Sequence, residues 1–219
     1  MRILHRAMTV FLSTLTLSCT LFAAEETDFP VKITDTLPYV DLSNDGKPLR
    51  VQRNQDTENM VDLDFAITSR SCPPFCIQPM SVASGVETIG ELELLEYIRR
   101  KDSGDNSIII IDSRTGEWLA KGMIPTAINI PWTALSLKTA SAKSIAEILE
   151  FQLDVISTEA LWNFENAKTA ILYCNGPWCG QSPTSIRTLL ALGYPANRIK
   201  WYRMGMQGWK MLGLTTVTP

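Results

Sequence analysis

Four consecutive isoleucines, residues 108–111, constrain the fold of this 219-residue chain more than any other feature. A run of β-branched residues favours a strand, and the lack of polar residues at alternate positions predicts burial on both faces. Such strands lie in the centre of parallel sheets that are covered by helices on both sides. From Val86 onwards, helical and strand patterns alternate with short links. The sequence therefore predicts an α/β fold with a parallel sheet flanked by helices.

Hydrophobic periodicity and the positions of glycine, proline and capping residues predict the individual elements. Ser182 and Pro183 are predicted to be the N-cap and the first residue of a helix. A weaker helical pattern covers residues 158–165. The predicted strands are 108–111, 127–130, 170–173 and 199–202, and the other predicted helices are 87–100, 117–121, 144–153 and 182–192.

Residues 25–85 differ from the rest of the chain because they are polar, interrupted by prolines and without a long helical period. Within them, residues 38–42 and 49–53 flank the segment Ser43-Asn44-Asp45-Gly46-Lys47. Two extended runs around a turn that contains glycine predict a β-hairpin. We therefore expect a small β-rich extension over 25–85, followed by the α/β domain over 86–219.

Residues 1–24 have the pattern of a secretory signal peptide. Two arginines precede an uncharged apolar stretch that ends in Ala23-Ala24. The stretch is shorter than the roughly 20 apolar residues that a membrane-spanning helix needs. Cys19 is not favoured as a lipoprotein anchor because Thr16 stands where a large aliphatic residue is expected. The sequence predicts export to the periplasm, with no stable membrane insertion after cleavage.

Removal of the predicted signal peptide changes the net charge of the chain and the side chains that are available for catalysis. Removing Arg2 and Arg6 from the 20 Lys and Arg leaves 18, against 23 Asp and Glu, which does not favour nucleic acid as a partner. The only histidine, His5, lies in the predicted signal peptide. An exported chain without imidazole excludes Cys-His catalysis and histidine-ligated metal sites. We predict no metal and no other cofactor.

The exported chain retains four cysteines in two close pairs, Cys72 with Cys76 and Cys174 with Cys179. An even number of cysteines outside the cytosol favours disulfides. The proline-rich spacer between Cys72 and Cys76 predicts an extended loop closed by a local disulfide. Two alternatives remain: a zinc site built from all four cysteines, and disulfide exchange between this loop and the second pair.

Cys174 follows the predicted strand 170–173 and precedes the helix predicted to begin near Ser182. Backbone N–H groups at a helix N-terminus favour negative charge and can lower the pKa of a thiol. The pattern leaves two roles open for Cys174, a nucleophilic thiolate or one half of a structural disulfide with Cys179. The candidate catalytic residues are Cys174 and Cys179, and the candidate substrate-binding loop is Asn175, Gly176, Pro177, Trp178, Gly180, Gln181 and Ser182.

Four motifs, in order, resemble the rhodanese-like domain family over roughly residues 86–217. The resemblance implies that Cys174 takes a sulfane sulfur from a donor such as thiosulfate, holds it as a persulfide and passes it to a thiol acceptor. The partners would be a small sulfur donor and a thiol acceptor, or the thiol of a partner protein. The motifs are Ile110-Ile111-Asp112-Ser113-Arg114, Gly122-Met123-Ile124-Pro125-Thr126-Ala127-Ile128-Asn129-Ile130-Pro131, Tyr173-Cys174 and Tyr202-Arg203-Met204-Gly205-Met206-Gln207-Gly208-Trp209.

The loop after Cys174 departs from the family pattern, in which four residues and then Arg-Ser follow the cysteine. Here seven residues separate Cys174 from Ser182, none of them is arginine, and Gln181 occupies the place before the serine. A neutral amide cannot form the bidentate, charged hydrogen bonds by which arginine binds sulfate-like or phosphate oxyanions. Thiosulfate as donor and phosphatase activity are therefore both disfavoured.

Three further residues are candidates for supporting roles. Asp112 and Arg114 follow a predicted strand at the same sheet edge as Cys174, where they could orient the loop or the substrate. The alternative is a surface ion pair that fixes the turn. Arg203, after the last predicted strand, is the candidate replacement for the missing loop cation.

Three functions follow from these observations. The first is sulfur transfer through a persulfide on Cys174. The second is thiol-disulfide exchange, in which Cys179 resolves a species formed on Cys174. The third is a catalytically inactive rhodanese-like module that binds a partner.

Overall fold

The structure is a computed structural model that describes residues 29–158 and 161–219. The predicted signal peptide lies outside these residues. No helix within the described ranges combines the length and the apolar character needed to cross a bilayer.

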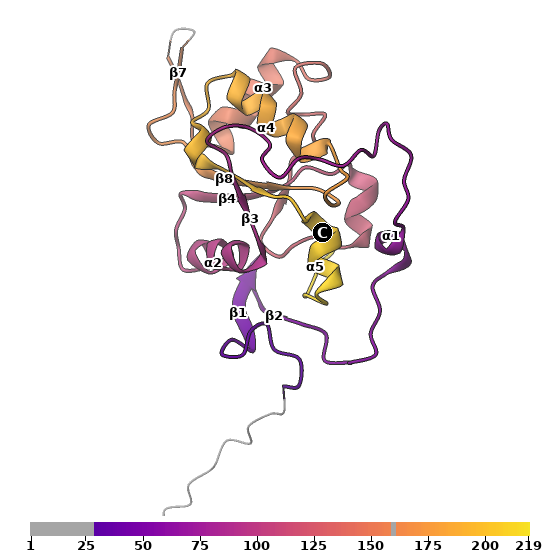
Figure 1. The fold of residues 1–219 in the computed structure, drawn as a ribbon. Helices are drawn as coiled ribbons and strands as arrows, with labels where there is room; N and C mark the ends of the chain where they lie inside the picture. Colours follow the sequence, from indigo (N-terminus) through magenta and orange to yellow (C-terminus); the bar gives the residue numbers. More distant parts are fainter. Residues whose placement is uncertain (1–28, 159–160) are drawn as a thin grey trace, which may run out of the picture.

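Within the described residues, five parallel strands form the central sheet in the order β3-β9-β8-β4-β5 (Figure 1). All five residues of the isoleucine-rich strand are buried, as the sequence predicted. The neighbouring strand that leads to Cys174 is buried over four of its five residues. The strands are β3 (Glu87–Ile89), β4 (Ile108–Asp112), β5 (Ile128–Asn129), β8 (Thr169–Tyr173) and β9 (Ile199–Tyr202).

Helices cover both faces of this sheet and enclose one hydrophobic cluster on each side (Figure 1). Two helices, α3 (Ala142–Phe151) and α4 (Gln181–Ala191), contribute to the first cluster. Two others, α2 (Glu91–Asp102) and α5 (Gly205–Met211), contribute to the second. The predicted helix-flanked parallel sheet is therefore confirmed. Two 3₁₀ helices, η1 (Gly116–Lys121) and η2 (Ala196–Arg198), complete the α/β part.

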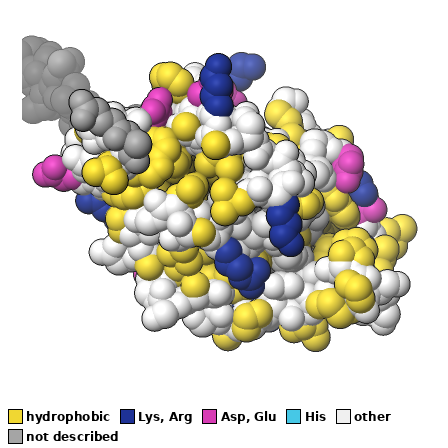
Figure 2. Space-filling view, turned by 90° about the horizontal axis from the view of Figure 1, so that it is seen from above, with side chains coloured by type: hydrophobic (Ala, Val, Ile, Leu, Met, Phe, Trp, Pro, Cys, Tyr) yellow, Lys and Arg dark blue, Asp and Glu magenta, His cyan; other side chains and the backbone are white. Residues whose placement is uncertain are grey.

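The predicted N-terminal hairpin is present and packs beside helix α2 (Figure 1). Strands β1 (Tyr39–Asn44) and β2 (Lys47–Gln52) pair antiparallel, and their two-residue turn has positive φ at Asp45 and Gly46. A one-turn helix, α1 (Leu63–Ala66), follows. This extension adds buried side chains to the second hydrophobic cluster, so it completes the core on that face. Those side chains are Val40, Leu42, Val51 and Phe65. Other hydrophobic side chains reach the surface, as the yellow areas of Figure 2 show.

Three local predictions were wrong. Glu87–Ile89 forms the edge strand β3, and the helix predicted from residue 87 begins only at Glu91. The segment predicted as helical over 158–165 contains part of an antiparallel pair, β6 (Ile156–Thr158) and β7 (Leu161–Asn163). Helix α4 begins at Gln181 with Gly180 at its N-cap position, so Ser182 lies inside the first turn. In the first case pairing with the distant strand β9 decided the local structure, and in the second the two short segments pair with each other.

Candidate active site

The loop 174–180 connects the end of β8 to the start of α4, and backbone hydrogen bonds from α5 fix its first two residues. The N–H of Met206 donates to the carbonyl of Cys174 at 2.9 Å, and the N–H of Gln207 donates to the carbonyl of Asn175 at 2.9 Å. Gly205 has a φ of 54°, and a Cβ at this position would overlap the carbonyl oxygen of Cys174. Only glycine allows this close approach of the two backbones.

The sulfur of Cys174 is buried, with hydrogen-bond donors beside it and one acceptor, the Cys179 carbonyl oxygen, at 3.5 Å. Burial by itself raises the pKa of this thiol. The Cys179 thiol, the Ser182 hydroxyl, and the backbone N–H groups of Ser182 and Gly176 outweigh burial and lower the pKa of Cys174 below its ordinary value. The Ser182 hydroxyl lies 3.2 Å from the sulfur. These donors favour the charged form of the Cys174 thiol.

A buried tryptophan orients the Ser182 hydroxyl. The indole Nε1–H of Trp201, on the neighbouring strand β9, donates to Ser182 Oγ at 3.1 Å. Because this bond occupies an acceptor site of the oxygen, the hydroxyl hydrogen is directed to the sulfur of Cys174. The sequence indicated Ser182 as a helix cap, and no local pattern relates it to Trp201.

The second thiol of the loop stays protonated. Burial, together with its hydrogen bond to Cys174 and the charge there, raises the pKa of Cys179 well above the ordinary value. Its sulfur lies 3.7 Å from Gln181 Oε1. Cys174 and Cys179 both carry free thiols in the described structure. Of the two thiols, Cys174 is therefore the one that loses its proton more readily.

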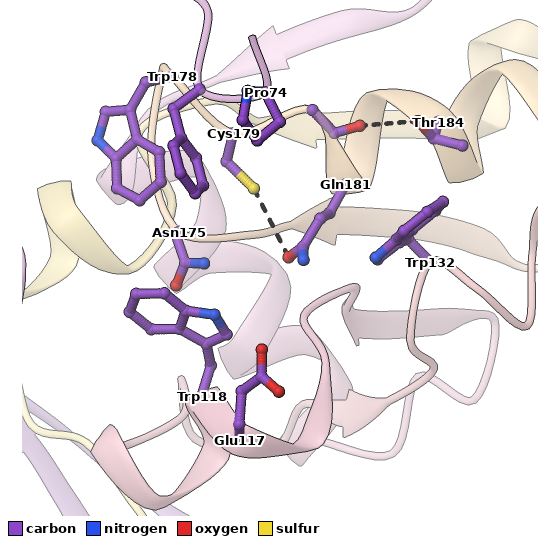
Figure 3. A pocket seen from close by; sticks show the side chains of 11 residues that line it. Pro74, Glu117, Trp118, Trp132, Asn175, Trp178, Cys179, Gln181 and Thr184 are labelled. Carbon is purple, nitrogen blue, oxygen red and sulfur yellow. Dashed lines mark hydrogen bonds between the residues drawn. The ribbon is translucent and has the colours of Figure 1, made fainter. Parts of the chain in front are cut away.

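A pocket of about 490 Å³ lies on the Cys179 side of this pair (Figure 3). Cys179 lines the pocket, whereas Cys174 does not. Figure 3 shows the Cys179 sulfur directed towards the Gln181 amide, with Trp178 and Pro74 on one side and Trp118 and Glu117 on the other. The residues that line the pocket belong to the loop 174–180, to α4, to η1, to the segment after β5 and to the N-terminal extension.

The N-terminal extension reaches the active loop through the segment around Cys72 and Cys76, which are joined by a disulfide. The ring of Phe75, inside this small loop, packs edge-on against Trp178 with ring centroids 5.6 Å apart. The N–H of Gln78 donates to the carbonyl of Pro177 at 2.8 Å. The disulfide-closed segment therefore forms one wall of the pocket. The sequence left open whether the extension reaches the loop, and the structure shows that it does.

Asp112 and Arg114 form a fully buried ion pair, not a surface pair. Arg114 Nη2 donates to Asp112 Oδ2 at 2.6 Å and to the Gly122 carbonyl at 2.7 Å. The hydroxyl of Tyr173, the residue before Cys174, donates to the same carboxylate at 3.0 Å. The pair fixes the turn after β4 and the end of β8, and neither residue lines the pocket.

Arg203 does not replace the missing loop arginine. Its guanidinium donates to the carbonyls of Gln78 at 2.8 Å and Pro79 at 3.1 Å, so it holds the extension in place. The residues that line the pocket include no lysine and no arginine. The prediction that Arg203 supplies the cation is therefore not supported by its position.

The family model of the rhodanese-like domain matches residues 94–212. The chain belongs to the rhodanese-like family. This match confirms the family that the four motifs indicated.

Comparison with known proteins finds several chains that are similar to this one. A helix-turn-helix-type transcriptional regulator of Mycobacterium tuberculosis is 27% identical over 119 residues, which are 54% of this chain and 41% of the regulator. This chain therefore spans less than half of that relative. A human single-domain sulfurtransferase is 19% identical, with a TM-score of 0.37 over 57% of this chain and 95% of its own. An As-Sb reductase of Leishmania major is 21% identical, with a TM-score of 0.41 over 58% of this chain and 79% of its own.

Proposed function

We propose that this protein is an exported sulfurtransferase that carries sulfane sulfur as a persulfide on Cys174. The observation that supports this most directly is the set of donors around the Cys174 sulfur. A persulfide anion also needs hydrogen-bond donors, and backbone N–H groups at the start of a helix supply them without a histidine. The family match over residues 94–212 is consistent with this chemistry.

The transfer consists of two nucleophilic displacements. The Cys174 thiolate attacks the outer sulfur of a donor R–S–SH, so that a bond from Sγ to sulfur forms and the donor S–S bond breaks. The group R–S⁻ leaves with the electron pair. An acceptor thiolate R′–S⁻ then attacks the outer sulfur of Cys174–S–SH and leaves as R′–S–SH, which regenerates the Cys174 thiolate. No oxidant or reductant is consumed.

Thiol-disulfide exchange is the second candidate, and the position of Cys179 favours it. Cys179 lies in the same loop as Cys174, its thiol donates to Gln181 Oε1, and it lines the pocket. In this reaction the Cys174 thiolate attacks a disulfide R–S–S–R and releases R–S⁻. Cys179 then attacks the Cys174 sulfur, its proton passes to a leaving thiolate, and a Cys174–Cys179 disulfide remains. The cysteine pair loses two electrons and the substrate disulfide gains them.

Intact-mass spectrometry separates these functions. The reduced protein without residues 1–24 is incubated with a glutathione persulfide donor, and then separately with glutathione disulfide. Sulfur transfer predicts a gain of one sulfur atom that is lost in Cys174→Ser and retained in Cys179→Ser. Exchange predicts a loss of two hydrogens that both variants abolish. If neither mass change occurs while the fold is intact, the protein is an inactive binding module and both catalytic proposals are wrong.

A further inference from the structure

We infer that the pocket beside Cys179 binds small organic sulfur compounds whose organic group is uncharged or positively charged. The same pocket does not bind sulfur oxyanions. This inference rests on the proposed function, because it assumes that the bound compound reacts with the cysteine pair. It concerns the chemical class of the substrate, which the family match leaves open.

The pocket walls are mainly aromatic. Trp178 lies on one side, and Trp118 and Trp132 lie on others (Figure 3). Phe75 also lines the pocket and packs against Trp178. Aromatic faces bind apolar groups and cations, and their negative quadrupole disfavours anions. A volume of about 490 Å³ is also in the range of organic ligand sites. The walls and the size therefore fit a carbon-containing sulfur compound.

The polar groups that line the pocket include two oxygen acceptors without a protein cation beside them. Glu117 contributes a carboxylate, and its one recorded hydrogen bond comes from the Thr115 hydroxyl at 3.0 Å. Asn175 is 2% exposed, and its buried Oδ1 has no hydrogen-bond partner among the described residues. An oxyanion in this pocket would lie near the Glu117 carboxylate, and no lysine or arginine among the described lining residues would replace the hydration that it loses.

The nearest cations do not line the pocket. Arg70 stacks on Trp178, with its guanidinium carbon 4.2 Å from the ring centroid, and donates to the carbonyl of Asp64. Lys121 lies 4.6 Å from the ring centroid of Trp118 and forms an ion pair with Asp64 at 2.8 Å. Both cations already interact with aromatic rings and with Asp64. Glu117 is therefore the one charged residue among the described residues that line the pocket.

Three disulfides of similar shape but different charge test this inference. Cystamine is a dication, bis(2-hydroxyethyl) disulfide is neutral and 3,3′-dithiodipropionate is a dianion. Binding is measured by tryptophan fluorescence on the Cys174→Ser/Cys179→Ser variant, in which exchange cannot occur. We expect the dianion to bind at least about five-fold more weakly than the neutral compound. We also expect that excess thiosulfate does not displace cystamine.

Two variants assign the effect to the pocket. Glu117→Gln, at an exposed residue, should reduce the affinity for cystamine more than the affinity for the neutral compound. Phe75→Ala should weaken all three ligands, because it removes part of a wall that they share. Glu150→Gln, an acidic residue of α3 outside the pocket lining, is the matched control and should change none of the affinities.

The outcomes separate this inference from the proposed function. Equal or tighter binding of the dianion, or displacement by thiosulfate, overturns the inference even if wild-type Cys174 takes up sulfur. Absence of sulfur uptake in the wild-type protein overturns the proposed function even if the charge order is as expected. Absence of measurable binding by all three disulfides also overturns the inference.

Discussion

The Ser182 hydroxyl connects the Cys174 sulfur to the central sheet through hydrogen bonds. Its hydroxyl lies between the Trp201 indole on β9 and the Cys174 sulfur after β8, two neighbouring parallel strands. A hydroxyl that is held from one side donates to the thiolate without first having to be ordered. Trp201, Ser182 and Cys174 thus form a buried chain of hydrogen-bonded side chains.

Ser182→Ala should reduce the thiolate fraction at Cys174. Loss of a donor to the charged form raises the pKa of Cys174, so alkylation by iodoacetamide should need a higher pH. At pH 7 the alkylation rate should fall about five-fold, which corresponds to one hydrogen bond of ~1 kcal/mol. The rate is measured as a function of pH in Cys179→Ser, so that Cys174 is the alkylated thiol of the pair.

Ser185→Ala is the matched control for this prediction. Ser185 lies on the same helix, is also buried, and its hydroxyl has no hydrogen-bond partner among the described residues. It should leave the pH profile unchanged. Trp201→Phe should shift the profile in the same direction as Ser182→Ala but less, because the hydroxyl remains and only its orientation is released.

Asp112→Asn should destabilise the whole protein. The substitution leaves the Arg114 guanidinium buried without its counter-charge, and breaking one partner of a buried pair costs about 3 kcal/mol or more. Urea unfolding followed by circular dichroism measures the loss. Asp41→Asn breaks an exposed ion pair with Arg50 and should change the stability much less. Equal effects of the two variants would contradict the structural role of Asp112.

At the scale of elements, the disulfide segment acts as a wall of the pocket. Two tethers hold it, the backbone bond from Gln78 to Pro177 and the guanidinium of Arg203. The Cys72–Cys76 disulfide restricts the loop that carries Phe75. A prediction about this wall therefore concerns its local order, not the stability of the sheet.

Cys72→Ser/Cys76→Ser should loosen the contact between Phe75 and Trp178. We expect acrylamide to quench the fluorescence of Trp178 more efficiently, because the ring becomes more accessible to solvent. Arg203→Gln should have a similar effect by releasing the second tether. The increase in quenching should disappear in a Trp178→Phe background. An increase that persists there would place the change elsewhere in the molecule.

At the scale of the whole molecule, the N-terminal extension and the sheet share one core. Phe65 is 1% exposed and belongs to the cluster that contains Trp209 of α5 and Ile110 of β4. The extension also pairs with the end of the chain, because the N–H of Thr215 donates to the carbonyl of Gln52 at 3.0 Å. These contacts predict that the extension and the α/β part unfold together.

Phe65→Ala should lower the free energy of unfolding by about 3 kcal/mol, because it opens a cavity in the shared core. A single transition should be observed by far-ultraviolet circular dichroism and by tryptophan fluorescence in urea. Leu63→Ala, on the same one-turn helix but with Leu63 86% exposed, should have little effect. Two separate transitions in the wild-type protein would show that the extension folds independently.

The sequence by itself predicted the features that depend on neighbouring residues. The isoleucine run, the segment before Cys174 and the hairpin with Gly46 have local patterns that determine their structures, and the four ordered motifs identified the family. The position of Cys174 between a strand and a helix was also sufficient to suggest a thiolate. These inferences need only periodicity, turn chemistry and the electrostatics of a helix N-terminus.

Only the tertiary structure decided what depends on contacts between distant segments. Residues 87–89 are a strand because β9 offers them a parallel partner, although their local pattern also suits a helix. Arg203 and Ser182 have hydrogen-bonding roles that no spacing indicates, since their partners are 124 and 19 residues away in the sequence. The opposite pKa shifts of Cys174 and Cys179 arise in the same way. Burial and hydrogen bonds set the two pKa values, and both are properties of the folded chain.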